Sequence, residues 1–272
     1  MIKSVQLDSI QINYTDAGSG QPVVLLHGFP LDHSMWTPQI AELSKECRII
    51  APDLRGFGQS TLTLEDAENG VEMHQYAEDV AALLDKIGLK EPVILCGFSM
   101  GGYVLWQFAL RYPKRVRAVV LCDTRAVADS NEAREGRIKT AEAVMESGLN
   151  SLIESMLPKL LSKVTLTQRP EVVSQVTQMM RSCEPAAVAA ALRGMAARED
   201  VTGELAKITL PALIIVGSED VISPPAEMRG MAELLPHVQF VEIPESGHMT
   251  TLENPGAVTE SLQRFVAEIT GG

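Results

Sequence analysis

Residues 93–104 read VILCGFSMGGYV, and they are the most informative part of the sequence about the fold. An apolar run of strand length comes first, and a helical pattern over Tyr103–Tyr112 follows it. Gly97 and Gly101 on either side of Ser99 permit a sharp turn where strand and helix nearly touch. Such a turn forces Ser99 to its tip, above the carboxyl end of the strand. The stretch therefore predicts an α/β architecture with a candidate nucleophile at a strand-to-helix turn.

Apolar runs of similar length recur on both sides of this turn. Unbroken apolar strands are typical of a parallel sheet that helices cover on both faces. Two short alternating runs near the start are typical of a hairpin instead. We therefore expect a mostly parallel eight-stranded sheet flanked by helices, with strands at 4–7, 10–14, 23–26, 47–51, 93–96, 116–122, 212–216 and 238–243.

The alternation of strands and helices stops after Asp123. From about 125 to 203 the sequence has helix-like stretches rich in Ala, Met, Leu, Glu and Arg, without a convincing strand. An ordinary crossover packed on the sheet is the alternative, but it needs only one helix. We predict a helical cap over 125–203, inserted after the sixth strand into a core domain formed by 1–124 and 204–272.

Composition limits the classes of partner and the compartment. The chain has 272 residues, 46% of them hydrophobic, and a formal net charge of −12 without long blocks of one sign. Nucleic acid and anionic membrane are not expected as partners, because phosphate binding requires clustered Lys and Arg. No secretory signal and no apolar run of membrane-spanning length are visible, so a cytoplasmic setting is the expectation. The oligomeric state does not follow from the sequence.

Cysteines and histidines are too sparse to form a familiar metal array. The four cysteines have no C-x-x-C spacing, and the five histidines include no H-E-x-x-H pair. We therefore expect neither a metal nor another cofactor.

A second motif precedes the first, since residues 23–30 read VVLLHGFP. A strand ending at His27-Gly28 would bring the backbone N–H of Phe29 opposite the N–H of Met100. Two such donors converging on one oxygen would form an oxyanion hole. His27 itself is expected to fix the loop by hydrogen bonding and not to act as a base.

Together the motifs resemble the α/β-hydrolase superfamily over nearly the whole chain. The residues that carry the resemblance are 27–30 (HGFP), 53–60 (DLRGFGQS), the turn around Ser99, 217–220 (GSED) and 246–248 (SGH). Within the superfamily they are most similar to small bacterial carboxylesterases and hydrolases like 3-oxoadipate enol-lactonase. Haloalkane dehalogenases and epoxide hydrolases share the loop around His27 but have an Asp nucleophile, so Ser99 favours acyl chemistry.

The superfamily order Ser…Asp…His assigns the other two members of a catalytic triad. Asp220 follows an apolar strand after the insertion and is the predicted acid, Glu219 is a weaker candidate, and Asp123 after the preceding strand is the rival. His248 lies on a Gly-containing loop after the last strand and is the predicted base.

Other conspicuous residues are expected to be structural. Arg55 and Asp53 are expected to be hydrogen-bonded in their turn, and Glu253 is expected to anchor the helix that follows it. Trp106 is interpreted as core, whereas Trp36 is also a candidate for an acyl pocket. Whether the methionines of the insertion (145, 156, 179, 180, 195) face a core or the active site stays open.

The resemblance implies a carboxylesterase-type serine hydrolase acting on a small-molecule ester. Three alternatives remain open: lactone hydrolysis, perhydrolase or cofactor-free haloperoxidase activity, and a small-molecule receptor that keeps the hydrolase fold.

Overall fold

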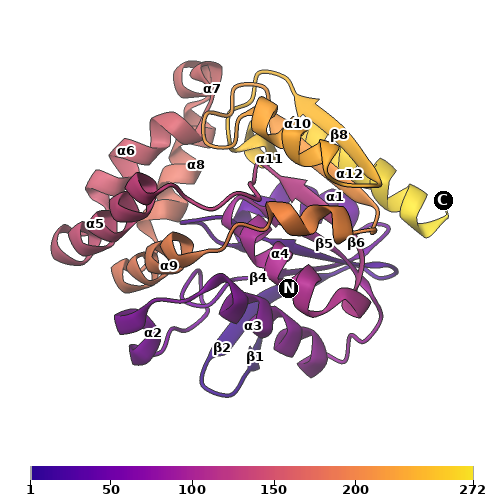
Figure 1. Cartoon of the computed structure of the whole chain (residues 1–272), viewed down its shortest axis with the longest axis horizontal. Helices are drawn as coiled ribbons and strands as arrows, with labels where there is room; N and C mark the ends of the chain where they lie inside the picture. Colours follow the sequence, from indigo (N-terminus) through magenta and orange to yellow (C-terminus); the bar gives the residue numbers. More distant parts are fainter. Residues whose placement is uncertain (1, 272) are drawn as a thin grey trace.

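The structure is a computed structural model that describes residues 2–271, with one eight-stranded sheet at its centre (Figure 1). The strand order is β1-β2-β4-β3-β5-β6-β7-β8. The two pairings that involve β2 are antiparallel and the remaining ones are parallel, which confirms the predicted mostly parallel sheet. The strands are β1 Ile2–Gln6, β2 Gln11–Ala17, β3 Pro22–Leu26, β4 Arg48–Pro52, β5 Val93–Phe98, β6 Val116–Cys122, β7 Ala212–Gly217 and β8 Val238–Ile243.

Helices cover both faces of the sheet, as the unbroken apolar strands require. Along β5, Ile94 and Cys96 face a core cluster that includes Trp36 and Phe265, whereas Leu95 faces the opposite cluster beneath α3 and α4. The core helices are α1 Thr37–Leu43, α2 Leu64–Asn69, α3 Met73–Lys86, α4 Met100–Arg111, α10 Pro225–Glu233, α11 Thr250–Glu253 and α12 Pro255–Thr270. Short 3-10 turns lie at His33–Trp36, Pro113–Arg115 and Thr202–Lys207. Within residues 2–271, no helix combines the length and the apolar character needed to cross a membrane.

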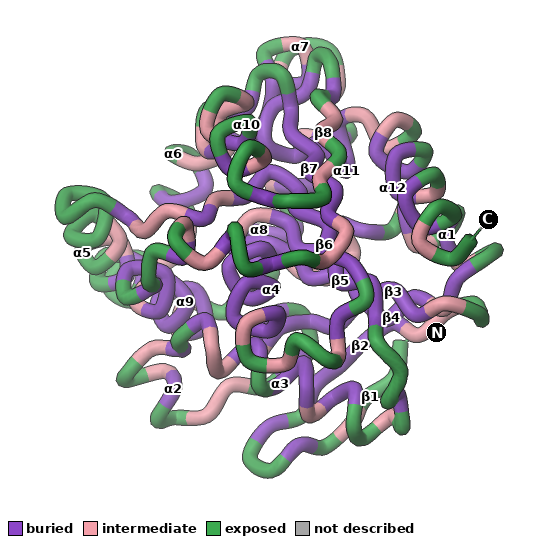
Figure 2. Tube along the Cα trace, turned by 45° about the vertical axis from the view of Figure 1, so that its right-hand side comes forward, coloured by how far each residue is buried: buried purple, intermediate pink, exposed green. Residues whose placement is uncertain are grey.

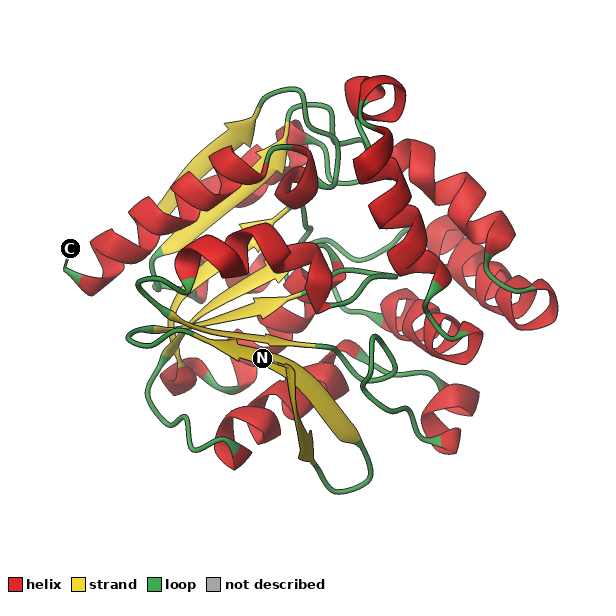
Figure 3. Cartoon of the chain, turned by 180° about the vertical axis from the view of Figure 1, so that it is seen from behind, coloured by secondary structure: helices red, strands yellow, loops and turns green. Residues whose placement is uncertain are grey.

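Five helices without an intervening strand connect β6 to β7, and we call them the cap helices. They are α5 Asn131–Ser147, α6 Asn150–Leu160, α7 Lys163–Gln168, α8 Pro170–Arg181 and α9 Pro185–Ala197. They gather on one side of the molecule, and the parallel strands point toward them (Figure 3). A Cβ on Gly194 of α9 would lie 1.7 Å from the carbonyl oxygen of Val71, so this helix approaches the core backbone closely.

Helix α4 starts earlier than its apolar pattern predicts, at Met100 instead of Tyr103. Gly101 and Gly102 have no apolar side chain, so the first turn of α4 cannot be predicted from the spacing of apolar residues. The helix is buried along nearly its whole length, whereas α5 is mostly exposed (Figure 2). The start of α4 is therefore fixed by core packing, which positions the residue before it.

Candidate functional site

Ser99 occupies the sharp turn between β5 and α4. Its backbone has φ 50°, its N–H donates to the carbonyl of Cys122 at 3.0 Å, and its own carbonyl accepts from the Thr124 hydroxyl at 2.7 Å. The turn needs glycine, because a Cβ on Gly97 would lie 2.4 Å from the Gly101 carbonyl oxygen. A positive φ at a non-glycine residue is a strained conformation that packing must hold in place.

A continuous chain of hydrogen bonds joins Ser99, His248 and Asp220. Nε2 of His248 lies 2.9 Å from Oγ of Ser99, and Nδ1 lies 2.8 Å from Oδ2 of Asp220. His248 and Asp220 are buried, while Ser99 is half-buried. Because the Asp220 carboxylate only accepts, Nδ1 carries the proton and Nε2 is left to accept from the serine hydroxyl. The structure thus brings together the three side chains that the sequence predicts as a triad.

Further donors hold the Asp220 carboxylate in its ionised form. Oδ1 accepts from the N–H groups of Ile222 (2.8 Å) and Ser223 (3.1 Å), and Oδ2 also accepts from the Ser223 hydroxyl (2.6 Å). Burial alone would raise the pKa of Asp220, but the charge and hydrogen bond of His248 and the bonds from Ser223 outweigh it and lower the pKa to about 2. This acid therefore stays charged throughout the neutral range.

Asp123, the rival acid, lies beside this chain without joining it. A ligand atom of its carboxylate lies within 4.8 Å of those of Asp220 and His248, but Oδ1 accepts from the Gly217 N–H at 2.9 Å and Oδ2 bonds the Thr250 hydroxyl. Full burial and the charge of Asp220 raise the pKa of Asp123 well above its ordinary value. Its carboxyl is thus engaged in joining the end of β7 to the start of α11, which follows His248.

Glu219, the weaker candidate, is exposed at the surface. It contributes its backbone N–H to the carbonyl of Ser246 at 2.8 Å, which ties the acid loop to the loop of the base.

Phe29 and Met100 lie on two backbone segments that approach each other at the turn. A Cβ on Gly101 would lie 2.4 Å from the Leu26 carbonyl oxygen and 2.7 Å from that of His27, so the end of β3 rests on the first turn of α4. Among residues 2–271, neither the Phe29 N–H nor the Met100 N–H donates a hydrogen bond to the protein. Both donors are thus available to an oxygen atom of a ligand.

His27 is engaged in bonding its own loop. Nδ1 donates to the carbonyl of Gly28 at 2.9 Å, and Nε2 accepts the N–H of Leu54 at 2.9 Å. Burial lowers the pKa of His27, which keeps the ring neutral. Its hydrogen-bonding capacity is used by the scaffold of the loop that carries Phe29.

The turn at 53–60 uses partners that the sequence does not indicate. Asp53 accepts from Nδ1 of His33 at 2.6 Å, while the Arg55 guanidinium pairs with Asp66 at 2.8 Å and with Asp79 at 2.6 Å. Arg55 and Asp53 are therefore both hydrogen-bonded as expected, each to a different segment.

The aromatic and methionine candidates divide between core and surface. Trp36 packs edge-on against Phe98, and Trp106 is buried against α3 with its indole N–H donating to the carbonyl of Arg125. Among the insertion's methionines, Met179, Met180 and Met195 are buried, Met156 is partly buried, and Met145 is 51% exposed.

Sequence reasoning missed two residues that shape the site, Ser223 and Thr124. Ser223 lies three residues after Asp220, a spacing at which an Asp side chain often bonds the following backbone and hydroxyl groups. That signal was available, whereas the bond from Thr124 to the Ser99 carbonyl depends on the pairing of β5 with β6.

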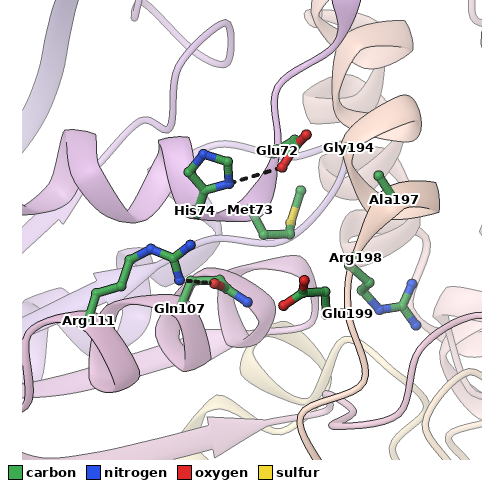
Figure 4. Close-up of a pocket in the computed structure, with 9 residues that line it drawn as sticks. All are labelled: Glu72, Met73, His74, Gln107, Arg111, Gly194, Ala197, Arg198 and Glu199. Carbon is green, nitrogen blue, oxygen red and sulfur yellow. Dashed lines mark hydrogen bonds and ion pairs between the residues drawn. The ribbon is translucent and has the colours of Figure 1, made fainter.

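A separate cavity of about 210 Å³ lies between α3, α4 and the end of α9 (Figure 4). Glu72 pairs with His74 at 3.0 Å, and Arg111 bonds Gln107. Arg198 pairs with Asp129 and does not reach across the cavity. Two pairs of its polar groups thus bond each other, and its nine lining residues include no Ser, Thr or Cys that could act as a nucleophile.

Comparison with known proteins identifies relatives over almost the whole chain. The family model described as alpha/beta hydrolase fold matches residues 21–255. A thermophilic esterase from Thermogutta terrifontis has a structure with a TM-score of 0.94 and 41% identity, covering 99% of each chain. 3-Oxoadipate enol-lactonase 1 of Acinetobacter baylyi is 28% identical over 96% of this chain and 93% of its own length. A putative non-heme bromoperoxidase of Mycobacterium tuberculosis is 29% identical over 96% of this chain and 99% of its own.

Proposed function

The chain belongs to the alpha/beta hydrolase fold family, and we propose that it is a serine hydrolase of carboxylic esters of small to medium size. The observation that carries the proposal is the hydrogen-bonded chain from the Ser99 hydroxyl through His248 to Asp220. A hydroxyl is a weak nucleophile at neutral pH, and an adjacent imidazole oriented by a carboxylate activates it. No metal or organic cofactor is needed for this chemistry.

Acylation begins when Oγ of Ser99 attacks the carbonyl carbon of the ester. The hydroxyl proton passes to Nε2 of His248, and the ionised Asp220 stabilises the resulting imidazolium. His248 then gives this proton to the oxygen of the leaving alcohol as the carbon–oxygen bond breaks. The acyl group remains bound to Ser99 as an ester.

Deacylation repeats the same proton transfers with water. His248 takes a proton from a water molecule, whose oxygen attacks the acyl carbon, and returns the proton to Oγ of Ser99 as the carboxylic acid leaves. In both steps the carbonyl oxygen becomes negatively charged. The N–H groups of Phe29 and Met100 are the proposed donors to that oxygen, each worth about 3 kcal/mol in comparable sites.

Substrate entry is assigned to the insertion. We propose that residues 125–203 form a cap over the strand ends, because the five helices between β6 and β7 lie on the side toward which the parallel strands point (Figure 3). Specificity then depends on cap side chains, and the fold alone does not select an ester.

The names of the relatives support this chemistry and add a second candidate. The 41% identical structure is that of an esterase, while a relative named enol-lactonase favours lactones as the second class. A lactone is an internal ester, so the same triad would open its ring. A panel of p-nitrophenyl esters of increasing acyl length, run beside simple lactones, separates the two.

Replacing Ser99 with Ala tests the proposal directly. We expect hydrolysis of p-nitrophenyl acetate and butyrate to fall at least about 10⁴-fold while the fold persists. Activity near the parent level in Ser99→Ala would contradict the assignment. Ligand-induced stabilisation without turnover by the parent protein would instead support a receptor.

A further inference from the structure

The loop that carries His248 is hydrogen-bonded on both sides of the histidine, to a cap helix after it and to Glu253 of α11 before it. After it, the N–H of Met249 donates to the carbonyl of Leu160, at the end of α6, at 3.0 Å. Before it, the N–H of Gly247 donates to Oε1 of Glu253 at 2.8 Å. The cap and the loop of the base therefore share backbone contacts, although more than 80 residues separate them in the sequence.

Glu253 extends the second of these bonds into the cap. Its other carboxylate oxygen, Oε2, accepts the N–H of Ser162 at 2.8 Å, and its backbone carbonyl bonds the guanidinium of Arg169. The residue is 6% exposed. A buried carboxylate that accepts two backbone N–H groups makes charge-assisted bonds, which are stronger than neutral ones. One side chain thus connects the residue before His248 to the residue before α7.

Direct backbone packing accompanies this connection. A Cβ on Gly247 would lie 2.7 Å from the nitrogen of Ser162 and 2.8 Å from the carbonyl carbon of Leu161. No side chain therefore fits between the loop of the base and the cap at this point. A displacement of 160–162 would be transmitted to residues 247–249.

The helix after Glu253 is anchored by a different residue. Asn254 is the N-cap of α12, and its side chain accepts from the N–H of Ala257. The sequence-based expectation that Glu253 anchors this helix is therefore wrong in its detail. Its carboxylate points back toward the base and the cap instead.

We infer that Glu253 is a positioning residue that holds the His248 loop against the cap segment Leu160–Ser162, so that the cap sets the alignment of the base toward Ser99. The inference rests on the proposed function, because alignment of Nε2 with Oγ matters only if that pair transfers a proton. Displacements of about 1 Å in a catalytic group cost up to about 100-fold in rate.

Three substitutions, two at Glu253 and one at Ser162, weaken the connection from its two ends. Glu253→Ala removes the carboxylate, and Glu253→Gln keeps one acceptor while placing an amide donor against the other N–H. Ser162→Pro removes the N–H within the cap. The backbone angles admit proline, because Ser162 has φ −63° and the preceding Leu161 is extended with ψ 145°. The ring carbon on its nitrogen then takes the place of the N–H that reaches Glu253.

Ser130→Pro is the matched control. Ser130 is the N-cap of α5, has φ −62°, and accepts from the N–H three residues later at 3.2 Å, as Ser162 does. It is exposed, and α5 lies away from α11 (Figure 1). Both proline variants change the start of a cap helix, but only Ser162→Pro breaks the bond to Glu253.

The readouts are kcat and KM for a p-nitrophenyl ester, together with the thermal midpoint. Glu253→Ala and Ser162→Pro are expected to lower kcat by about 10- to 100-fold with little change in KM. Glu253→Gln is expected to lose less, and Ser130→Pro to keep the parent kcat. If Glu253 had a purely structural role, the Glu253 variants would have a lower thermal midpoint but the same kcat as Ser130→Pro. That result would overturn the inference.

Failure of the proposed function has a different signature. The parent protein would then not hydrolyse esters, and a fluorophosphonate would not label Ser99. Should Glu253→Ala not fold, Glu253→Gln and Ser162→Pro still decide the question, since unchanged kcat in both contradicts the inference.

Discussion

Nδ1 of His248 lies 2.8 Å from Oδ2 of Asp220, and the same oxygen accepts the Ser223 hydroxyl at 2.6 Å. The two residues reach each other from loops that follow adjacent parallel strands, β7 and β8. Their contact fixes which imidazole nitrogen faces Ser99. Asp123, after β6, lies close enough to be an alternative candidate for the carboxylate that orients His248. The first experiment therefore distinguishes the two carboxyl groups.

Asp220→Asn is expected to reduce kcat for ester hydrolysis by about 10⁴-fold, because the amide no longer enforces the tautomer in which Nε2 accepts from Ser99. Asp123→Asn is the control, since an amide in its place still accepts from Gly217 and bonds Thr250. Steady-state kinetics of both variants decide the matter. An equal loss in Asp123→Asn would assign the acid role to Asp123.

Asp123→Asn is also expected to stabilise the protein at neutral pH. The pKa of Asp123 is raised by burial and by the charge of Asp220, so the folded chain binds this proton more tightly than the unfolded chain does. The free energy of unfolding of the parent therefore falls as the pH rises above 3.8, the ordinary value, whereas the Asn variant lacks this decline. Urea unfolding at about pH 4 and about pH 7 measures the difference. A difference that does not widen with pH would contradict the expectation.

Ser223→Ala is expected to cost about 1.5–3 kcal/mol, because it removes a buried hydrogen bond to a charged group. The pKa of Asp220 should rise as a result. Since that pKa is lowered from 3.8 to about 2 in the folded chain, the stabilisation it gives is present above 3.8 and is lost as the pH falls toward about 2. The difference in the free energy of unfolding between the parent and Ser223→Ala should therefore become smaller as the pH falls from 3.8 toward about 2. The loss of kcat should be smaller than in Asp220→Asn, because His248 keeps its carboxylate partner.

Gly101→Ala is expected to destabilise the protein by about 1–3 kcal/mol. The added Cβ would lie 2.4 Å from the Leu26 carbonyl oxygen, and backbone must shift to admit it. Gly136→Ala in the exposed helix α5 is the matched control, since its Cβ would meet nothing within 4 Å. That variant should gain about 0.5–1 kcal/mol from helix propensity. Urea unfolding of the two variants measures the change in the free energy of unfolding of each. A decrease in Gly136→Ala as large as in Gly101→Ala would contradict the argument.

The strands and the turn around Ser99 could be predicted from local sequence. Residues 212–217 form the strand that their apolar run indicates, with β7 extending one residue to Gly217, and residues 238–243 form the expected last strand although Gln239 and Glu242 interrupt its apolar residues. The hairpin was predicted from Ser4, but β1 begins at Ile2, because an exposed edge strand is held by backbone pairing that leaves no burial pattern. Five helices fill the insertion, whose lack of strand-forming runs is also a local property.

Local sequence is enough to fix the order of the motifs, the position of Ser99 at a strand end, and the small set of residues from which its partners come. The three-dimensional arrangement shows that Asp220 is hydrogen-bonded to His248 while Asp123 bonds Gly217 and Thr250. It also gives Arg55 its partners Asp66 and Asp79, and it places Glu253 between the base loop and the cap. Strand formation depends on neighbouring side chains, whereas each of these pairings depends on which backbone N–H, imidazole or cation from a distant segment reaches a given carboxylate oxygen.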